Sequence, residues 1–528
     1  MFRLIPNALL RQLYTRNSLR NTPDGFVFSL KNRLADARFT GLRLVRIDGR
    51  AYDPDVFTLE PDGAPPTPVT AITPERPLDF PLRRSVTVHA RTEPLPPGRH
   101  RLVFTLQTLP FGLLTIEVED ELQEEISPAG PDDRAASGIP RDPVDDTGPD
   151  ILRRRQAYLE SRTGLALQHL TAYSFDPAVS RGHCEQFVGA AQVPVGLAGP
   201  LRINGDHANG EFFIPLATTE GTLVASYNRG IKLLNRCGGV TCTVLDEGMQ
   251  RAPVFVLPDA RAARDLARWV AEQESALRDE AESTSRYARL KYITPYQTGR
   301  LLFLRFGFTT GDAAGQNMVT KATLAACHYL LQHRTEVEHF YLESNLATDK
   351  KPSFINTLQT RGKRVTAEVT IPKEILISEL QVDPEQLDRH ARIGNLGAFL
   401  AGANNNGLHA ANALAALFIA TGQDVACLAE SSAAVTSSEL LPNGDLYGSV
   451  TLPSLVIGTV GGGTGLPTQR ECLEIMGCYG PGQVLKFAEI VAGVVAAGEL
   501  SLAAAISSLD WVSSHEAVRN QKAGPSGT

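Results

Sequence analysis

Residues 215–226 read PLATTEGTLVAS, and this stretch decides the fold assignment. Small and neutral side chains surround one carboxylate, Glu220, directly before a pattern typical of a helix. Burial in such surroundings raises the pKa of a carboxyl group and would let Glu220 act as a general acid near neutral pH. The alternative is a glutamate that only complements the positive end of a helix, and this stretch alone does not separate the two.

Two polar segments downstream have the same unusual character. Residues 345–352 read NLATDKKP. Adjacent lysines before a proline are typical of a solvated loop, but an ammonium group held beside carboxylates, such as that of Lys350, can stabilise an oxyanion. Asp424 belongs to the segment Gly422-Gln423-Asp424, at the end of an apolar helical pattern that also carries His409 and Asn412. It is an ordinary turn residue unless a cation pairs with it.

Two glycine-bearing segments and one histidine complete the candidate site. Residues 311–318 read GDAAGQNM and residues 458–464 read GTVGGGT, and neither is the Gly-x-Gly-x-x-Gly pattern that follows a strand. No Walker motif occurs, so a Rossmann or P-loop site is excluded, although exposed backbone N–H groups can still cradle a pyrophosphate. His515 is a candidate proton donor to a leaving group, because an unperturbed histidine has a pKa of about 6.5.

Composition bounds the class of protein. The chain has 528 residues, 43% of them hydrophobic and 21% charged, with a net charge of -7. These values predict about three or four globular domains and give no reason to expect a nucleic-acid or membrane partner. We expect no secretory signal and no spanning helix, since the apolar run before Glu499 is too short. Seven cysteines without a Cys-x-x-Cys pair indicate reduced thiols, no metal site and a cytoplasmic protein.

The first 120 residues are expected to form a β-sandwich. Apolar residues alternate at Leu102, Phe104 and Leu106, and Asp48-Gly49 marks a hairpin. The run FSLKNRL at residues 28–34 resembles the β-sandwich subunit of bacterial C-glycoside deglycosidases, but an accessory or interaction module is the favoured interpretation. Residues 121–150 are acidic, proline-rich and poor in apolar side chains, which predicts a linker.

The order and spacing of the motifs after residue 150 are more specific than any one of them. Residues 151–520, about two-thirds of the chain, resemble the class I 3-hydroxy-3-methylglutaryl-CoA (HMG-CoA) reductases. The resemblance rests on CEQFVG at 184–189, VPVGLAGPL at 193–201, ATTEG at 217–221, NRG at 228–230, DKKP at 349–352, GQD at 422–424 and GTVGGGT at 458–464. Glycine after Glu220 matches class I, whereas class II would have proline there.

The resemblance implies a reaction and a role for each catalytic residue. These enzymes reduce HMG-CoA to mevalonate and CoA in isoprenoid biosynthesis, with two hydride transfers from a nicotinamide. By resemblance, Lys350 stabilises the oxyanions and Glu220 donates a proton to the mevaldehyde carbonyl. Asp424 hydrogen-bonds both, and His515 protonates the departing CoA thiolate.

The resemblance also implies binding residues. Arg251 matches the arginine that grips the substrate carboxylate, and the other substrate and CoA positions are Asn345, Asp349, Lys351, His409, Asn412, Ser226, Asn228 and Arg229. The cofactor positions are Ser285, Arg286, Asp312, Ala313, Gly315, Gln316, Asn317, Met318, Gly461 and Gly462. Ser285 and Arg286 match positions near the 2′-phosphate, which favours NADPH over NADH. No metal is implied.

The implied fold is α/β (α+β) with three domains. A large domain, residues 151–251 and 342–528, surrounds a long central helix, and a ferredoxin-like cofactor domain is inserted at 252–341. His515 would lie on a C-terminal flap. The family builds its site across a subunit interface, so we expect a homodimer or a dimer of dimers. The sterol-sensing membrane domain of the animal enzymes is not expected.

The chain departs from the family pattern in several places, and the changes at Glu343 and at Asn404 to Asn406 leave an alternative open. Glu343-Ser344-Asn345 replaces Ser-Gly-Asn, and Asn404-Asn405-Asn406 replaces a Gly-Gly-aromatic stretch. The substrate-pocket lysine that the family has upstream of this stretch is not evident, and Arg392 is its nearest candidate. The tail after His515 lacks the motif that carries a regulatory phosphoserine in the animal enzymes. The alternative is a diverged paralogue that binds or reduces a different CoA thioester.

Overall fold

The N-terminal β-sandwich consists of two antiparallel sheets. The computed structural model describes residues 10–33, 36–122, 138–142 and 144–508. One sheet has the strand order β1-β2-β8-β5-β6 and the other β10-β9-β3-β4, with β7 paired to β3. The bounds are η1 (Arg11–Leu13), β1 (Arg20–Thr22), β2 (Gly25–Lys31), β3 (Ala37–Ile47), β4 (Arg50–Tyr52), η2 (Pro54–Val56), β5 (Phe57–Pro61), β6 (Thr67–Pro68), η3 (Val69–Ala71), β7 (Leu78–Phe80), β8 (Ser85–Arg91), β9 (Arg99–Leu109) and β10 (Gly112–Glu121).

The sandwich confirms the alternation seen in the sequence. Leu102, Phe104 and Leu106 of β9 are all buried in a core that is separate from the rest of the protein. The predicted hairpin joins β3 to β4, with Ile47 opposite Arg50. Asp48 and Gly49 both have positive φ, +52° and +83°, as a two-residue turn that matches strand twist requires.

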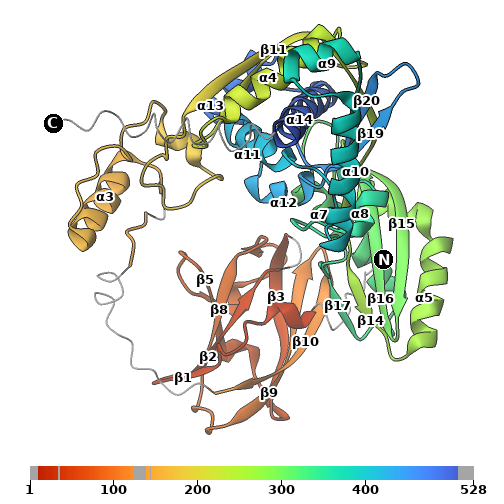
Figure 1. Ribbon diagram of the computed structural model, residues 1–528. Coiled ribbons are helices and arrows are strands. Elements are labelled where there is room, and N and C mark those ends of the chain that lie inside the picture. Colours follow the sequence, from red (N-terminus) through yellow and green to blue (C-terminus); the bar gives the residue numbers. More distant parts are fainter. Residues whose placement is uncertain (1–9, 34–35, 123–137, 143, 509–528) are drawn as a thin grey trace.

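The large domain is a six-stranded sheet covered by helices (Figure 1). Its strand order is β12-β11-β13-β18-β20-β19, antiparallel except for the β11–β13 pair. The bounds are α3 (Pro149–Thr163), η4 (Pro177–Ser180), β11 (Val195–Gly205), β12 (Asn209–Ala217), α4 (Leu223–Arg236), β13 (Val240–Arg251), α8 (Phe354–Leu358), β18 (Gly362–Ile371), α9 (Lys373–Leu380), α10 (Pro384–Leu400), α11 (Ala410–Thr421), η5 (Val425–Cys427), α12 (Leu428–Ser431), β19 (Val435–Leu440), β20 (Leu446–Leu455), η6 (Gly462–Gly465), α13 (Pro467–Ile475) and α14 (Val484–Ser507).

The expected central helix is α14, which packs against the sheet and against α4, α9, α10 and α11. Two buried glutamates on α14 anchor chain segments on either side of it. Glu489 accepts the backbone N–H groups of residues 206–208 in the β11–β12 turn, and Glu499 accepts those of residues 408–410 at the start of α11. By length and composition alone α14 could cross a membrane, but 72% of its apolar window is buried inside the protein. Its apolar surface therefore belongs to the core of the large domain.

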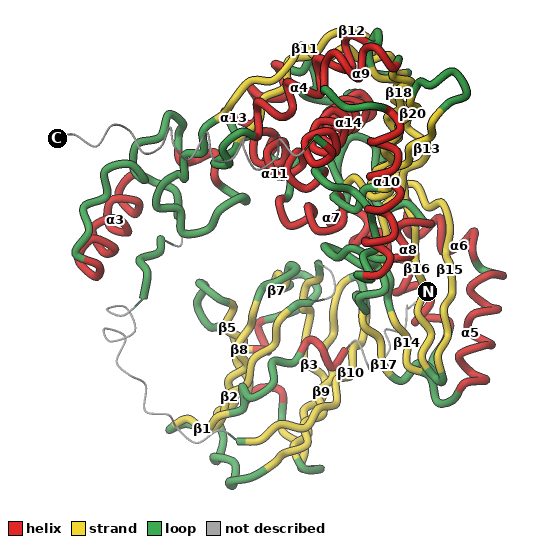
Figure 2. The backbone as a smooth tube through the Cα atoms, viewed as in Figure 1, coloured by secondary structure: helices red, strands yellow, loops and turns green. Residues whose placement is uncertain are grey.

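The inserted domain has the ferredoxin-like order of elements (Figure 2). Along the chain it runs β14 (Val254–Val256), α5 (Ala260–Glu272), α6 (Glu274–Glu282), β15 (Arg289–Thr298), β16 (Leu301–Thr309), α7 (Gln316–His333) and β17 (His339–Tyr341). With α5 and α6 together in the place of the first helix, the order of elements is βαββαβ. This order and the sheet order β17-β14-β16-β15 are those of the ferredoxin-like motif. The end of β13, residues 249–251, pairs with β16, so one continuous strand joins the two domains.

The crossing of α4 and α14 supplies a stability test. A Cβ at Gly230 would lie 1.9 Å from the carbonyl oxygen of Ala497, so α4 approaches α14 only because residue 230 has no side chain. Gly230→Ala is expected to destabilise the large domain by about 3 kcal/mol, the cost of overpacking a core. The matched control is Gly394→Ala on α10, where a Cβ meets nothing within 4 Å. Urea denaturation followed by circular dichroism checks this, and equal midpoints for the two variants would contradict it.

Candidate active site

The lysine and aspartate that the sequence singled out form an ion pair. Lys350 Nζ lies 2.9 Å from Asp424 Oδ2, and both side chains are partly exposed. The hydrogen bond that Lys350 donates to Asp424 is the main reason that the pKa of Lys350 is raised. Asp424 also caps η5 by accepting the N–H of Ala426, which fixes its carboxylate. Asp424 is therefore more than a turn residue, because it pairs with Lys350, whose side chain is held as an ammonium ion.

The loop that carries Lys350 has a strained backbone. Asn345, Thr348 and Lys350 have φ values of +67°, +59° and +57°. Non-glycine residues rarely adopt this region, and they keep it only where surrounding contacts hold them. Here Glu430 of α12 accepts the backbone N–H of Lys350 at 3.3 Å, and Thr348 donates its hydroxyl to Asn356 at 3.0 Å. These contacts set the direction in which the Lys350 side chain leaves the loop.

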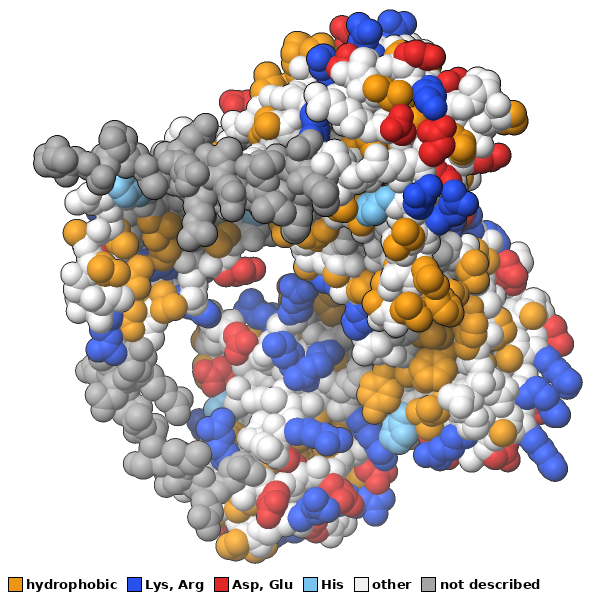
Figure 3. Space-filling model, viewed as in Figure 1, with side chains coloured by type: hydrophobic (Ala, Val, Ile, Leu, Met, Phe, Trp, Pro, Cys, Tyr) orange, Lys and Arg blue, Asp and Glu red, His pale blue; other side chains and the backbone are white. Residues whose placement is uncertain are grey.

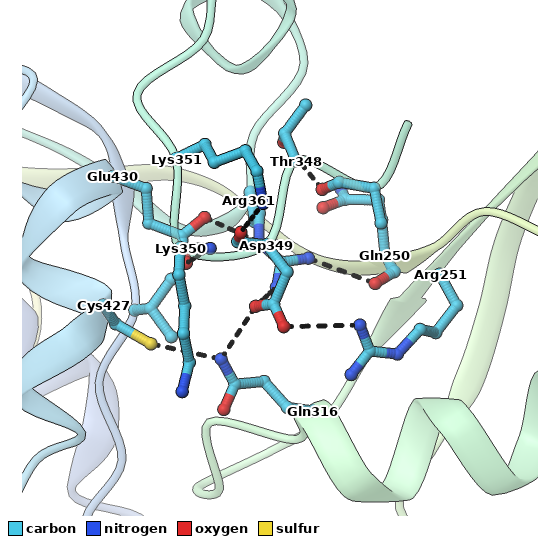
Figure 4. A network of polar contacts seen from close by, with 12 residues as sticks. Gln250, Arg251, Gln316, Thr348, Asp349, Lys350, Lys351, Arg361, Cys427 and Glu430 are labelled. Carbon is cyan, nitrogen blue, oxygen red and sulfur yellow. Dashed lines mark hydrogen bonds and ion pairs between the residues drawn. The ribbon is translucent and has the colours of Figure 1, made fainter. Parts of the chain in front are cut away.

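A buried arginine lies beneath this loop (Figure 4). Arg361 is fully buried and donates to Glu430 Oε2 at 2.7 Å, to Asp349 Oδ1 at 2.5 Å and to the carbonyl of Gln250 at 3.1 Å. Burial alone would raise the pKa of Asp349, but Arg361 and Arg251 outweigh it and hold that pKa below its usual value. One guanidinium thus joins α12, the lysine loop and β13.

Arg251 lies at the end of β13 and points into the same site. Its Nε donates to Thr320 of α7 at 2.7 Å. Its Nη1 lies 3.0 Å from Glu343 and 3.5 Å from Asp349, so two carboxylates of the protein already face it. The guanidinium that the sequence assigned to a substrate carboxylate is therefore brought beside Lys350 by the junction of the two domains.

Glu220 lies elsewhere in the chain and is exposed. Both of its carboxylate oxygens accept from Asn412 Nδ2, at 3.2 and 3.1 Å. The expectation that Glu220 is buried is wrong for the single chain. The physical reason is that residue 220 lies in the turn between β12 and α4, where its side chain reaches outward to the first turn of α11.

Helix α11 separates the two halves of the site. Asn412, the partner of Glu220, lies in its first turn, and Asp424, the partner of Lys350, follows its last. Twelve helical residues span roughly 18 Å at 1.5 Å per residue. Within one chain, Glu220 and Lys350 therefore lie at opposite ends of α11 and cannot act on the same atom.

The Glu220 end also holds several of the predicted CoA and substrate residues. Ser226 Oγ lies 3.4 Å from His409 Nε2 and 3.1 Å from Ser501 Oγ, and Arg229 donates to that same Ser501 oxygen at 3.0 Å. The His409 ring stacks on Tyr227 with centroids 4.8 Å apart. Burial lowers the pKa of His409 to about 4, so the imidazole is neutral at physiological pH.

The remaining predicted substrate residues have local partners. The Asn228 amide oxygen accepts the N–H of Gly199 at 2.8 Å. Asn345 donates its backbone N–H to Glu343 at 2.7 Å, and Lys351 Nζ reaches the carbonyl of Asp349 at 3.0 Å. Arg392, the candidate for the missing pocket lysine, pairs with Asp388 of its own helix at 2.6 Å and is exposed.

The two glycine segments meet near Asp424. Thr459 donates its N–H to the carbonyl of Asp312 at 2.8 Å, and a Cβ at Gly458 would lie 2.8 Å from the nitrogen of Ala314. A Cβ at Gly422 would lie 2.2 Å from the carbonyl oxygen of Gly463. Absent side chains therefore allow residues 311–318, 422–424 and 458–464 to pack backbone to backbone.

The outer face of this glycine cluster is open. Gly461 and Gly462 have φ values of +79° and +57°, and a Cβ on either would meet nothing within 4 Å. Gln316, with Asn317 and Met318, forms the first turn of α7, where helix N–H groups favour an anion. Gln316 Nε2 contacts Asp349 Oδ1 at 3.2 Å, which links this surface directly to the lysine loop.

Ser285 and Arg286 lie on the turn before β15. The Ser285 hydroxyl accepts the N–H groups of Tyr287 and Ala288, at 3.1 and 3.3 Å, and Arg286 is exposed. Tyr287 comes within 4.0 Å of a Cβ built on Gly311. This turn therefore borders the glycine segment that precedes α7.

Several residues of the site were missed by sequence reasoning. Arg361 and Glu430 gave no signal because an isolated Arg and Glu are common in any sequence, and only the fold buries them together. Cys427 accepts from Gln316 Nε2 at 3.1 Å, and burial raises its pKa to about 12, so it stays a thiol. His515 lies outside the described residues.

The fold is of the α/β class, and its site places the Lys350–Asp424 ion pair beside a surface of open glycine backbone. Comparison with known proteins gives the family. A model described as "Hydroxymethylglutaryl-coenzyme A reductase" matches residues 151–520, and one described as "Hydroxymethylglutaryl-CoA reductase, N-terminal domain" matches residues 9–123. The chain belongs to the hydroxymethylglutaryl-CoA reductase family.

Relatives and solved structures agree with this assignment. The 3-hydroxy-3-methylglutaryl-coenzyme A reductase of Pyrococcus abyssi is 47% identical over 371 residues, which cover 69% of this chain and 91% of that protein. The corresponding protein of Methanothermobacter thermautotrophicus is 46% identical over 368 residues, 69% of this chain and 91% of that protein. The NADPH-bound class II reductase of Streptococcus pneumoniae shares the fold, with a TM-score of 0.52 at 20% identity over 67% of this chain and 96% of that chain.

The neutral state of His409 predicts a pH dependence of stability. The unfolded chain protonates His409 near its usual pKa of 6.5, whereas the folded protein does so only near 4. Protonation thus favours unfolding between those values, and stability is lost as the pH falls through this window. Between pH 7 and pH 5 the wild type should lose about 2 kcal/mol more unfolding free energy than His409→Gln. Urea titrations at both pH values measure this, and equal losses would refute it.

Proposed function

We propose that the chain catalyses the NADPH-dependent reduction of HMG-CoA to mevalonate and CoA, as a class I reductase of the mevalonate pathway. The observation that carries the proposal is the Lys350–Asp424 pair at 2.9 Å beside Arg251 and the glycine surface. An ammonium group kept protonated by a carboxylate suits stabilisation of an oxyanion on a thioester or aldehyde carbonyl. The alternative is a paralogue that acts on another CoA thioester, and Glu343 beside Arg251 favours it.

The roles of the protein groups follow from their surroundings. Lys350 donates to the carbonyl oxygen, and Asp424 keeps its ammonium charged and aimed. Arg251 binds the carboxylate at the far end of the acyl chain, because a guanidinium offers paired donors to a carboxylate. Glu220, exposed and hydrogen-bonded to Asn412, supplies the proton to the aldehyde oxygen. His515 protonates the departing thiolate from the C-terminal segment.

The glycine surface fits a dinucleotide phosphate. Gly461 and Gly462 present backbone without side chains, and the first turn of α7 presents helix N–H groups, so a pyrophosphate has donors on both sides. Ser285 and exposed Arg286 border the same surface and suit a 2′-phosphate, which favours NADPH. The cofactor, when bound, supplies hydride, while Asp312 to Met318 position it beside Lys350.

Assembly of two copies would complete the site. Because α11 separates Glu220 from Lys350 within one chain, a Glu220 from a second copy must reach Lys350. The last two turns of α10 expose Ile393, Leu396, Phe399 and Leu400, between 59% and 79% each. Phe354 and Leu358 of α8 are also exposed, 74% and 76%. Figure 3 shows an apolar patch in the part of the view where Figure 1 draws α8 and α10. Both observations support a second copy of this chain as the occupant of this surface.

Domain limits and location complete the proposal. Residues 1–120 form the accessory sandwich, 121–150 the linker and 252–341 the cofactor domain between the two parts of the large domain. The sandwich core takes its residues from positions 10–116 in the described part of the chain. The protein is assigned to the cytoplasm.

Removal of the ammonium group tests the catalytic role. Lys350→Met should lower kcat with HMG-CoA by about 10²–10³-fold, because the oxyanion loses its charged donor. The control is Lys373→Met, whose lysine forms a similar 3.0 Å pair with Glu385 on the surface. NADPH oxidation followed at 340 nm is the assay. Absence of turnover by the wild type, or equal turnover by the Lys350 variant, would end the proposal.

A charge on the apolar surface tests the assembly. Phe399→Asp should convert a dimer into monomers and abolish turnover, because desolvating an unpaired carboxylate in an apolar interface is costly. Leu113→Asp on the sandwich, where the leucine is 63% exposed, is the control. Light scattering after size-exclusion chromatography gives the mass. An active monomer of either the wild type or the variant would contradict the shared site.

A further inference from the structure

Glu343 occupies a position where the proposed substrate would place its own carboxylate. It follows β17, and its Oε2 lies 3.0 Å from Arg251 Nη1. Its Oε1 accepts the backbone N–H of Asn345 at 2.7 Å, at the start of the strained lysine loop. One side chain therefore both pairs with the substrate-facing arginine and caps the loop of Lys350.

The carboxylates of the site already outnumber the cations that pair with them, without a ligand. The cations Arg251, Arg361 and Lys350 pair with the carboxylates of Glu343, Asp349, Asp424 and Glu430, whereas Lys351 Nζ contacts the backbone carbonyl of Asp349. A ligand carboxylate entering this site adds an uncompensated negative charge. It gains a strong ion pair with Arg251 only if one of the resident carboxylates leaves.

Of the two carboxylates on Arg251, Glu343 is the one able to leave. Asp349 is also bound to the fully buried Arg361 at 2.5 Å, so its displacement would leave a buried guanidinium without that partner. Glu343 has a 40% exposed side chain and no second cation among its contacts in the described residues. Rotation of Glu343 toward solvent breaks its partly exposed ion pair with Arg251 and one hydrogen bond that caps the lysine loop.

We propose that Glu343 is a specificity-determining residue, an internal carboxylate that competes with the acyl carboxylate of the substrate for Arg251. It weakens binding of thioesters that carry a free carboxylate and leaves binding of uncharged acyl thioesters unchanged. This inference rests on the proposed function, because it takes Arg251 as the residue that binds the acyl chain.

The test compares two charge-removing variants on two thioesters. Glu343→Gln keeps an oxygen for the N–H of Asn345 but has no charge, and Glu343→Ser does the same with a hydroxyl. The substrates are HMG-CoA and 3-hydroxy-3-methylbutyryl-CoA, which has the same branched acyl chain without the carboxylate. The matched control is Glu338→Gln, whose glutamate is 41% exposed and pairs with Arg300 at 3.1 Å.

Both Glu343 variants should lower KM for HMG-CoA by about five- to tenfold, the size of one charge-assisted contact, with kcat changed less than twofold. KM for the uncharged thioester should stay the same, and Glu338→Gln should match the wild type on both. A split between KM and kcat of this kind is not produced by a loss of loop order, which would lower kcat.

The outcomes separate this inference from the proposed function. An unchanged or higher KM for HMG-CoA in the Glu343 variants, with an active wild type, overturns the inference and leaves the function standing. A wild type inactive on HMG-CoA whose Glu343→Gln variant gains activity supports the inference and overturns the function. Inactivity of every form on both thioesters overturns both.

Discussion

The ion pair between Arg361 and Glu430, both fully buried, is the interaction on which the site depends. Taking two charges out of water is costly, and the remaining donors and acceptors of the pair offset that cost by binding Asp349, the N–H of Lys350 and the carbonyl of Gln250. The pair thus holds a loop whose backbone would relax if released. The conformation of the loop that carries Lys350 is therefore set by two buried side chains beneath it.

Buried charged side chains also hold backbone segments along the central helix of the large domain. Each of the two buried glutamates of α14 binds three consecutive backbone N–H groups, Glu489 at the β11–β12 turn and Glu499 at the start of α11. Burial raises the pKa of Glu499, and only those hydrogen bonds oppose the shift. An otherwise apolar helix therefore fixes the position of His409 through polar contacts.

Helix α11 connects this scaffold to function. Its first turn holds the partner of Glu220 and its end leads to the partner of Lys350, so the length of one helix separates Glu220 from Lys350 within one chain. The same chain exposes an apolar surface on α10 and α8. The separation along α11 and the exposed apolar surface are independent observations, and both support the proposed assembly of two copies.

Apolar alternation and turn chemistry are local properties, so the sequence alone predicted the β-sandwich and the Asp48-Gly49 hairpin. Motif spacing likewise singled out Lys350, Asp424 and Arg251, which the structure brings into one site. Only the tertiary structure decided that Arg361 and Glu430 support the loop, since their burial arises from segments far apart in the chain. It also placed Glu220 in the open and Glu343 on Arg251. The exposure of a side chain and its ion-pair partners depend on which segments of the chain come together in the fold, and a local sequence pattern does not specify this.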